Sequence, residues 1–215
     1  MYIVNYTSDD FKDICDRVSP RLFCKEINEK IGDRIWIAPE VPYGQSYDLS
    51  IYPGTVTVPS EVMADYLFHV CKSFYNNGLK NIVFLNGHGG NITALGLAAE
   101  KLVDLGAVVV TINWWLDFSK DILTVTEGQG HAGEDETSAV LYYNESLVQM
   151  EKATKNFNKQ LYPVKFKDRG KTIFRDAITG DATLASREKG EKIFDLLEDR
   201  IINIINLMEK GKYFE

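Results

Sequence analysis

The chain has 215 residues, of which 45% are hydrophobic and 26% charged, and its formal net charge is −7. This length and composition are typical of a globular protein with a well-buried core, so we expect one domain over residues 1–215. The acidic balance argues against a general nucleic-acid binder. No apolar run is long enough to span a membrane, which argues against an integral membrane protein.

Residues 1–5 lack the basic flank and the long apolar core of a signal peptide. The three cysteines, Cys15, Cys24 and Cys71, include no C-x-x-C pair. An odd number of widely spaced cysteines favours free thiols in a reducing compartment. We therefore predict a cytoplasmic protein.

The first third of the chain predicts a strand, a helix and a second strand. Residues 2–4 form a short apolar run typical of a strand. Pro20 after Ser19 is a helix-start signal, and the apolar spacing that follows predicts a helix over residues 21–31. Residues 34–38 predict the next strand, and the proline-containing stretch after it predicts a loop.

A second helix is predicted over residues 59–77. Its helical spacing predicts a core face made of Val62, Tyr66, Val70 and Phe74. His69 lies in the same amphipathic segment, and we interpret it as a packed or surface helix residue rather than a ligand.

Residues 80–85 are a continuous apolar run typical of a buried strand, and Asn-Gly-His-Gly-Gly-Asn (86–91) follows it before a helix start. Glycines let a ligand approach the backbone closely, and a helix N-terminus offers unpaired N–H groups. Open α/β sheets bind ligands at such strand ends. We therefore predict a functional role for His88; the alternative is a glycine-rich turn that this histidine merely caps.

A helix to about residue 105 and a buried strand over residues 107–112 come next. Trp114 and Trp115, at the end of that strand, predict either an aromatic wall for a flat substrate or core filling. Residues 150–185 predict a polar, lysine-rich excursion with little regular structure. Residues 182–210 predict a long terminal helix. Because strands alternate with helices, the predicted class is α/β, with a mostly parallel sheet flanked by helices.

A second glycine-flanked histidine, His131, is followed by the acids Glu134, Asp135 and Glu136 at a helix start. A divalent metal binds imidazole nitrogens and carboxylate oxygens. His88 and Glu136 could supply two such ligands from different strand ends, which leaves His131 as a general acid/base. Acids at a helix start are also favoured by the helix dipole, which explains part of the pattern because three acids cannot all be ligands.

The order of these motifs resembles the creatininase (creatinine amidohydrolase) family. The matching segments are Tyr43-Gly44, Tyr-Pro-Gly-Thr (52–55), Asn-Gly-His-Gly-Gly-Asn (86–91), His-Ala-Gly-x-x-Glu-Thr-Ser (131–138), and the patterns at 180–185 and 189–192. The resemblance implies a doubly wound α/β fold and assembly as a homo-oligomer. It also implies hydrolysis of a cyclic or linear amide-type C–N bond, or another ring opening, with one or two divalent metals such as Zn, Mn or Fe.

Carried over to this sequence, the resemblance makes His88 and Glu136 metal ligands and His131 the group that transfers protons. The residues predicted to contact a small-molecule substrate are Gly89, Gly90, Asn91, Tyr43, Trp114 and Trp115. The aromatic members of this set suggest a flat or ringed, mostly uncharged molecule, although packing explains them equally well.

The N-terminal segment departs from the family pattern, which has Glu-Gln-His-Gly and, further on, an aspartate that bridges two metals. An ungapped count places that aspartate at Asp16, but places the glutamate and histidine at Asn5 and Thr7. Fewer ligands favour one metal ion rather than two, and the predicted ligands of that ion are Asp16, His88 and Glu136. Met1 falls where the family's first strand should begin, so an in-frame Glu-x-His upstream would indicate an earlier start.

Three functions are compatible with these motifs. The first is a metal-dependent amidohydrolase that attacks its substrate with a metal-activated water. The second is a catalytically degenerate member that binds a small molecule or sister subunits without turnover. The third is a sugar- or nucleotide-binding domain, which is disfavoured because the motif lacks G-x-G-x-x-G spacing and an adjacent lysine. Two intact histidine motifs favour the enzyme.

Overall fold

The computed structural model describes residues 2–6, 14–158 and 160–214, with side chains described from residue 19 onward except at residue 33. Within these residues, four strands form one parallel sheet in the order β2-β1-β3-β4. The strands are β1 (Tyr2–Tyr6), β2 (Trp36–Ile37), β3 (Asn81–Asn86) and β4 (Val108–Asn113). The strands predicted at residues 2–4, 34–38, 80–85 and 107–112 are thus confirmed, with ends that differ by a few residues.

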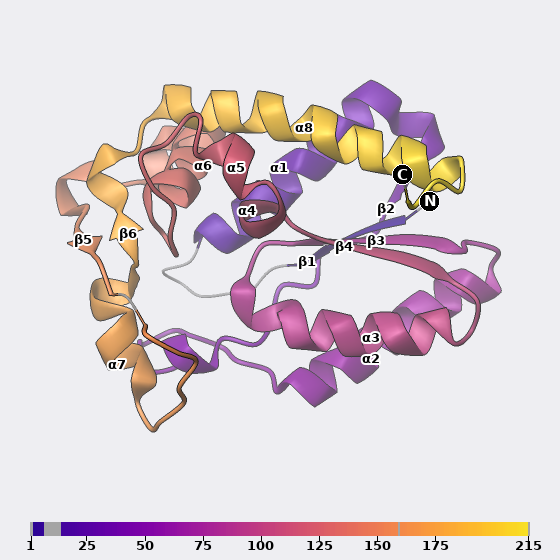
Figure 1. The fold of residues 1–215 in the computed structure, drawn as a ribbon, viewed down its shortest axis with the longest axis horizontal. Helices are drawn as coiled ribbons and strands as arrows, with labels where there is room; N and C mark the ends of the chain where they lie inside the picture. The colour runs from indigo at the N-terminus through magenta and orange to yellow at the C-terminus, as the bar shows by residue number, and fades with distance from the viewer. Residues whose placement is uncertain (1, 7–13, 159, 215) are drawn as a thin grey trace.

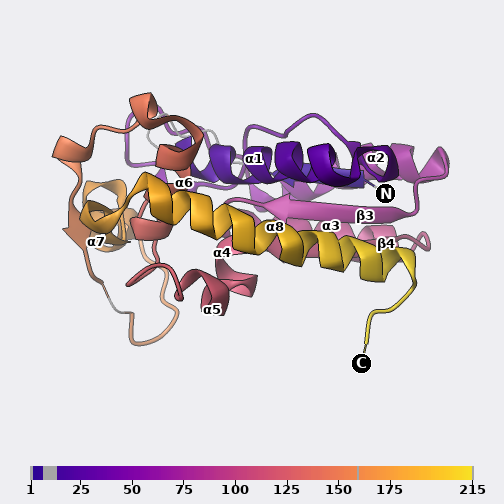
Figure 2. The same ribbon diagram turned by 90° about the horizontal axis from the view of Figure 1, so that it is seen from above.

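Helices cover both faces of this sheet, which confirms the predicted class (Figures 1 and 2). One face carries α1 (Ile14–Ile31) and α8 (Arg187–Glu209), and the other carries α2 (Ser60–Asn76) and α3 (Ile92–Val103). The shorter helices are α4 (Trp114–Asp117), α5 (Ser119–Ile122), α6 (Glu134–Asn144) and α7 (Arg169–Ile173). Helix α6 packs against α1 and α8.

Strand β3 shows why the chain forms two cores. Val83 and Leu85 pack into the core beneath α1 and α8, whereas Ile82 and Phe84 pack into the core beneath α2 and α3. Alternate side chains of a strand point to opposite faces, so a strand covered on both faces must be apolar throughout. This is the physical reason for the continuous apolar run, and it makes the fold doubly wound.

The strand order contains a switch point between β1 and β3. The chain moves from β1 to β2 on one side of the sheet and then crosses to β3 and β4 on the other. Open parallel sheets bind ligands beyond the carboxyl ends of the strands at such a point. The segment that leaves β3 there is Gly87-His88.

Helix α1 corrects one sequence prediction. It begins at Ile14, so Pro20 lies inside the helix and is not its first residue. Proline usually stops or kinks a helix because it has no N–H for the i−4 carbonyl. Here Leu22, Phe23 and Ile27 are buried against the sheet, and this packing outweighs the missing hydrogen bond.

The predicted core face of α2 is wrong in part, because Val62 and Tyr66 are each 54% exposed, whereas Phe74 packs against the core beneath α2 and α3. The side chains that α2 buries are Met63, Ala64, Leu67 and Cys71. The last helix, in turn, begins later than predicted. Residues 182–184 form a 3-10 turn, and Ser186 caps α8 by accepting the backbone N–H of Lys189.

Residues 150–185 form the predicted excursion, which lies at one end of the molecule (Figure 1, left). Its elements are short: η5 (Met150–Lys152), β5 (Lys155–Asn156), α7, η6 (Arg175–Ala177), β6 (Gly180–Asp181) and η7 (Ala182–Leu184). No helix in the described part of the chain is both long and apolar enough to cross a lipid bilayer.

Candidate active site at the carboxyl edge of the sheet

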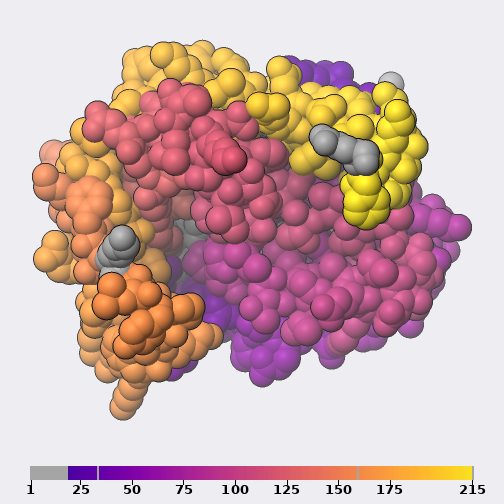
Figure 3. Space-filling model, viewed as in Figure 1, coloured from indigo at the N-terminus to yellow at the C-terminus, as the bar shows by residue number. Residues whose placement is uncertain are grey.

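A cavity of about 550 Å³ opens where the excursion faces the carboxyl ends of the strands. In Figure 3 the surface is hollowed between the excursion and the region of α3. The lining residues that could bind or react are His88, His131, Glu136, Gln45, Asp48, Gln129, Lys165 and Arg169. Its apolar walls come from Trp115, Leu116, Phe166 and Phe174. The two glycine-flanked histidines, 43 residues apart in the sequence, therefore meet in one cavity.

An asparagine network fixes the backbone on which His88 stands. The side chain of Asn86 accepts the N–H of His88 (3.1 Å) and donates to its carbonyl (2.9 Å). Asn86 is tied in turn to Asn113 at the end of β4 (2.8 Å) and to Asn91 (3.3 Å). These bonds satisfy buried polar groups and leave the imidazole as the reactive group that this loop presents to the cavity.

Asn91 joins this loop to the preceding one instead of lining the cavity. Its side-chain oxygen accepts the N–H of Gln45 (2.9 Å). A Cβ on Gly44 would lie 2.3 Å from that oxygen, so the Tyr43-Gly44 motif needs its glycine for close packing. The predicted substrate contact of Asn91 is replaced by a structural role in which it positions Gln45.

The two glycines after His88 differ sharply in the space around them. A Cβ on Gly90 would lie 1.9 Å from the carbonyl oxygen of Gln45 and 2.8 Å from Nε2 of His88. A Cβ on Gly89 would meet only the Trp115 ring, at 3.8 Å. Only Gly90 is therefore required by close approach.

We expect Gly90→Ala to displace His88 and to lower both metal affinity and turnover by at least about 10-fold, since reacting groups tolerate little misplacement. Gly89→Ala is the matched control and should stay within about twofold of wild type, because its new methyl group makes an ordinary contact. Metal titration of the two purified variants tests this directly. Equal affinities would contradict the close approach seen at Gly90.

The backbone of His131 is fixed by two hydrogen bonds to Thr179. Its N–H donates to the Thr179 hydroxyl, its carbonyl accepts the Thr179 N–H, and both distances are 2.9 Å. A Cβ on Gly130 would lie 2.2 Å from the Thr179 carbonyl oxygen, so the glycine before the histidine lets the two segments touch. The Phe174 ring stands edge-on to the imidazole at 5.3 Å between centroids. The excursion therefore orients His131.

The three acids at the start of α6 are all buried, yet they do three different things. Glu134 forms an ion pair with Lys189 (2.5 Å) and accepts the N–H groups of Glu127 (2.9 Å) and Gly128 (3.1 Å). It ties α6 to α8 and to the preceding loop. Glu134 therefore has a structural role and does not line the cavity.

Asp135 organises the loop that carries His131. Its carboxylate accepts the N–H of Gly130 (3.1 Å) and the side-chain amide of Gln129 (3.2 Å). Burial raises the pKa of Asp135 to about 6, and these hydrogen bonds oppose that shift. Gln129 also donates to the carbonyl of Trp115 (2.8 Å), so this acid positions part of the cavity wall.

Glu136 is the acid that reaches the cavity. Its Oε2 accepts the N–H of Ala132 (2.6 Å) and lies 4.0 Å from Nδ1 of His131. Ala132 has a left-handed backbone conformation (φ 48°), a strain that is typical of functional turns. The rings of His88 and His131 lie 6.1 Å apart between centroids. Two imidazoles and one carboxylate therefore face a common space.

The chemistry of this donor set fits a divalent transition metal, because nitrogen and oxygen ligands of this kind suit Zn and Mn. Among the described side chains, no group of three or more His, Cys, Asp or Glu residues is arranged so that it could hold a metal ion. The backbone of Asp16 lies in α1, but its side chain is outside the described part of the chain, as is Thr7. The predicted role of Asp16 therefore stays a prediction.

The remaining predicted substrate contacts divide into two groups. Trp115, Gly89 and Gly90 line the cavity. Trp114 is 1% exposed and packs on Phe23 in the core, so its predicted substrate contact is wrong and core filling explains it. Tyr43 is exposed but does not line the cavity, whose lining on this segment begins at Gln45.

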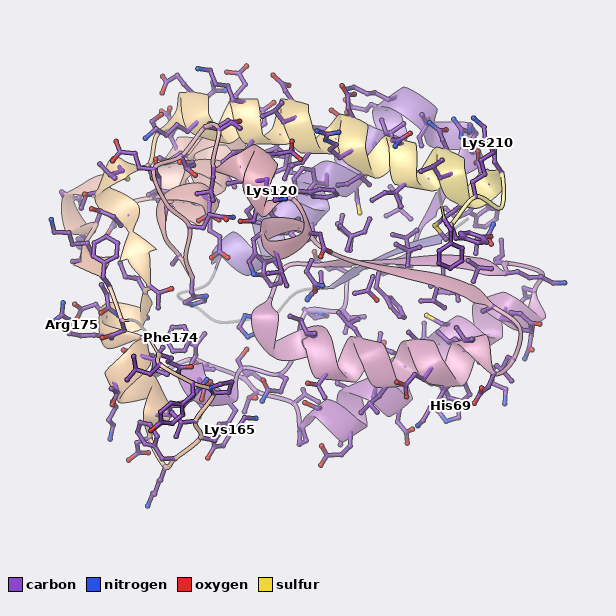
Figure 4. All side chains as sticks on the ribbon, in the orientation of Figure 1. His69, Lys120, Lys165, Phe174, Arg175 and Lys210 are labelled. Carbon is purple, nitrogen blue, oxygen red and sulfur yellow. The ribbon has the colours of Figure 1, made fainter. Side chains whose placement is uncertain are left out.

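His69, the third histidine, lies on the exposed surface of α2, far from Phe174 and the cavity (Figure 4). Sequence reasoning missed the excursion residues Lys165, Phe166, Arg169 and Phe174, which line the cavity from a segment without periodic pattern. The only available signal was the concentration of lysine and aromatic residues there.

The fold and the site together define an open α/β protein with a histidine–carboxylate centre at the switch point of its sheet. A sequence model of the creatininase family, described as creatinine amidohydrolase, matches residues 14–205. The chain therefore belongs to the creatininase family.

Solved structures of creatininase show the same fold. A creatinine amidohydrolase (creatininase) crystal structure superposes with a TM-score of 0.81 at 22% identity, covering 96% of this chain and 90% of that one. A creatininase mutant superposes with a TM-score of 0.80 at 23% identity, covering 95% and 89% of the two chains. Other creatininase structures are described as a Zn-Zn type and as a Mn form.

Curated relatives include two kinds of hydrolase. A 3-dehydro-scyllo-inosose hydrolase of Thermotoga maritima is 28% identical over 193 residues, which cover 74% of this chain and 62% of that protein. A mycofactocin precursor peptide peptidase of Mycolicibacterium smegmatis is 30% identical over 161 residues, covering 74% and 61%. The aligned part thus spans about three fifths of the length of these relatives.

Proposed function

We propose that this protein is a metal-dependent hydrolase that cleaves a C–N bond, in an amide or a cyclic amide, of a small molecule. The observation that carries the proposal is the meeting of His88, His131 and Glu136 in one cavity. A volume of about 550 Å³ suits a small substrate. The family, and relatives described as a hydrolase and a peptidase, support hydrolysis as the reaction class.

The residues of the proposed site divide into metal ligands and a proton carrier. His88 and Glu136 would hold the divalent metal, with Asp16 as the proposed third ligand and one ion in place of two. When bound, such a metal lowers the pKa of its water and polarises the substrate carbonyl. Zn, Mn and Fe are the candidate ions, and the metals named for creatininase structures support the first two.

His131 carries the proton in this proposal. An imidazole titrates near neutral pH, so it can take a proton from the attacking water and deliver it to the leaving nitrogen. Its neighbours restrict how the ring can turn, since Phe174 lies edge-on to it and Glu136 lies 4.0 Å from Nδ1.

Metal analysis of protein purified without chelator tests the proposal. We expect a divalent metal to co-purify and to be lost in His88→Ala, because that variant removes an imidazole ligand. His69→Ala is the matched control and should keep the metal, since His69 lies on the far surface of α2. If wild-type protein neither co-purifies with Zn, Mn or Fe nor binds any of them at about micromolar concentration, the hydrolase proposal is wrong.

The same measurements address the second candidate, a degenerate member that binds without turnover. Bound metal without hydrolysis of amides, cyclic amides or short peptides would favour it. Single-domain organisation, cytoplasmic location and assembly into a homo-oligomer also stay predictions, and gel filtration with light scattering would test the last.

A further inference from the structure

Four charged residues line the cavity, two acids and two cations, and they differ in how they are paired. Asp48 and Arg169 neutralise each other in a two-pronged ion pair in which Nε of Arg169 lies 3.2 Å from Oδ1 of Asp48, and its NH2 group contacts Oδ2. Glu136 faces His131 and, in the proposed function, the metal. Lys165 is the remaining cation on the described lining.

Lys165 has no ion pair or hydrogen bond to any described residue, and its side chain is exposed at the cavity wall. Its neighbours are fixed by contrast. Arg169 donates to the Val164 carbonyl (3.1 Å), and Gly170 sits so close to the Asp48 carbonyl oxygen that a Cβ there would lie 1.7 Å from it. Lys165 thus lines the cavity from a segment that is itself anchored.

The sequence around Lys165 is strongly basic in an acidic protein. The excursion, residues 150–185, carries eight lysines and arginines against four acids, whereas the whole chain has a net charge of −7. A cluster of one charge sign beside a cleft raises the local concentration of the opposite charge. The excursion therefore favours entry of an anion.

The excursion also supplies apolar surface beside this charge. Phe166 and Phe174 line the cavity together with Trp115 and Leu116. Lys165 and Phe174 lie on the same side of the molecule in Figure 4. A ligand that fits this wall has a flat or apolar part and an anionic group at one end.

We propose that Lys165 is a specificity-determining residue that pairs with a carboxylate of the substrate, so that the preferred substrate is an anionic amide or cyclic amide. This inference rests on the proposed function for the bond that is cleaved. It replaces the mostly uncharged substrate that the tryptophans alone suggested. The apolar wall that includes Trp115 holds the ring, and Lys165 holds the charge.

The test compares two probes that differ in one charge. Hydantoin-5-acetate is a cyclic amide with a carboxylate, and hydantoin-5-acetamide is its neutral counterpart of the same shape. We expect calorimetric titration of the metal-containing protein to show about 10-fold tighter binding of the acetate, as for one charge-assisted hydrogen bond. Lys165→Met should remove the preference, and Lys165→Arg should keep most of it.

Lys167→Met is the matched control, because this lysine belongs to the same excursion but does not line the cavity. Its preference for the acetate should stay within about twofold of wild type, since exposed charges at a distance are screened by salt. Equal binding of the two probes by wild type, no binding of the acetate, or an unchanged preference in Lys165→Met would overturn the inference. Binding is measured without turnover, so a charge preference in a protein that hydrolyses nothing would refute the proposed function and leave the role of Lys165 standing.

Discussion

Replacing His131 by glutamine is expected to lower kcat by about 10²- to 10⁴-fold, the usual contribution of a positioned general acid/base. Glutamine can still form hydrogen bonds but does not titrate near neutral pH. The fold should survive, because the contacts that fix residue 131 to Thr179 run through the backbone N–H and carbonyl. Metal content should also stay close to wild type, because His88 and Glu136 are the proposed ligands.

A lowered kcat together with an unchanged metal content distinguishes a proton carrier from a metal ligand. Steady-state kinetics on an amide that the wild type hydrolyses gives kcat, and elemental analysis of the same preparation gives the metal. His69→Gln is the control for loss of a histidine at an exposed position on α2 and should leave both values unchanged. Turnover by His131→Gln at the wild-type rate would refute the assigned role, and loss of metal would make His131 a ligand.

The sheet and its two layers of helices could be read from the sequence because burial on both faces leaves a strong signal. Strands β3 and β4 lack the alternation of a half-buried strand, and each is followed by residues typical of a ligand-binding edge. The position of His88 just beyond β3 was therefore predictable.

Helix details were less predictable because tertiary packing overrode local signals. Pro20 reads as a helix start, yet burial of neighbouring side chains extends α1 back to Ile14. In α2, aromatic and β-branched residues occur at two helical spacings. Only contact with α3 decides that Met63 and Leu67 are buried while Tyr66 is exposed.

The site was half predictable for a related reason. Glycine-flanked histidines can be recognised in the sequence. The excursion, however, reaches the cavity through pairings between distant residues, such as Arg169 with Asp48, 121 positions apart. No periodicity encodes such a contact. Likewise, the sequence placed three acids at the start of α6, and only geometry could assign Glu136 to the cavity and Glu134 to an ion pair.

That ion pair leads to the largest expected effect on stability. Glu134 is 1% exposed, and its charge is balanced by Lys189, which also donates to the Leu184 carbonyl (2.8 Å). Glu134→Gln keeps the size and a carbonyl oxygen for the N–H groups of residues 127 and 128, but removes the charge. We expect a loss of about 3 kcal/mol in the free energy of unfolding, because removing one partner leaves a partly buried charge uncompensated.

Glu145→Gln is a matched control, since the Glu145–Arg187 pair (3.7 Å) also joins the end of α6 to the start of α8 but is exposed on both sides. It should cost less than about 0.5 kcal/mol, the usual value for an exposed pair. Urea unfolding followed by tryptophan fluorescence gives both numbers, provided that the slope m is unchanged.

Combining Glu134→Gln with Lys189→Met should recover part of the loss, because a neutral pair needs no buried counter-charge. If Glu134→Gln unfolds at the same urea concentration as Glu145→Gln, the pair does not stabilise the fold. The first acid of the motif would then have to be explained by the active site itself.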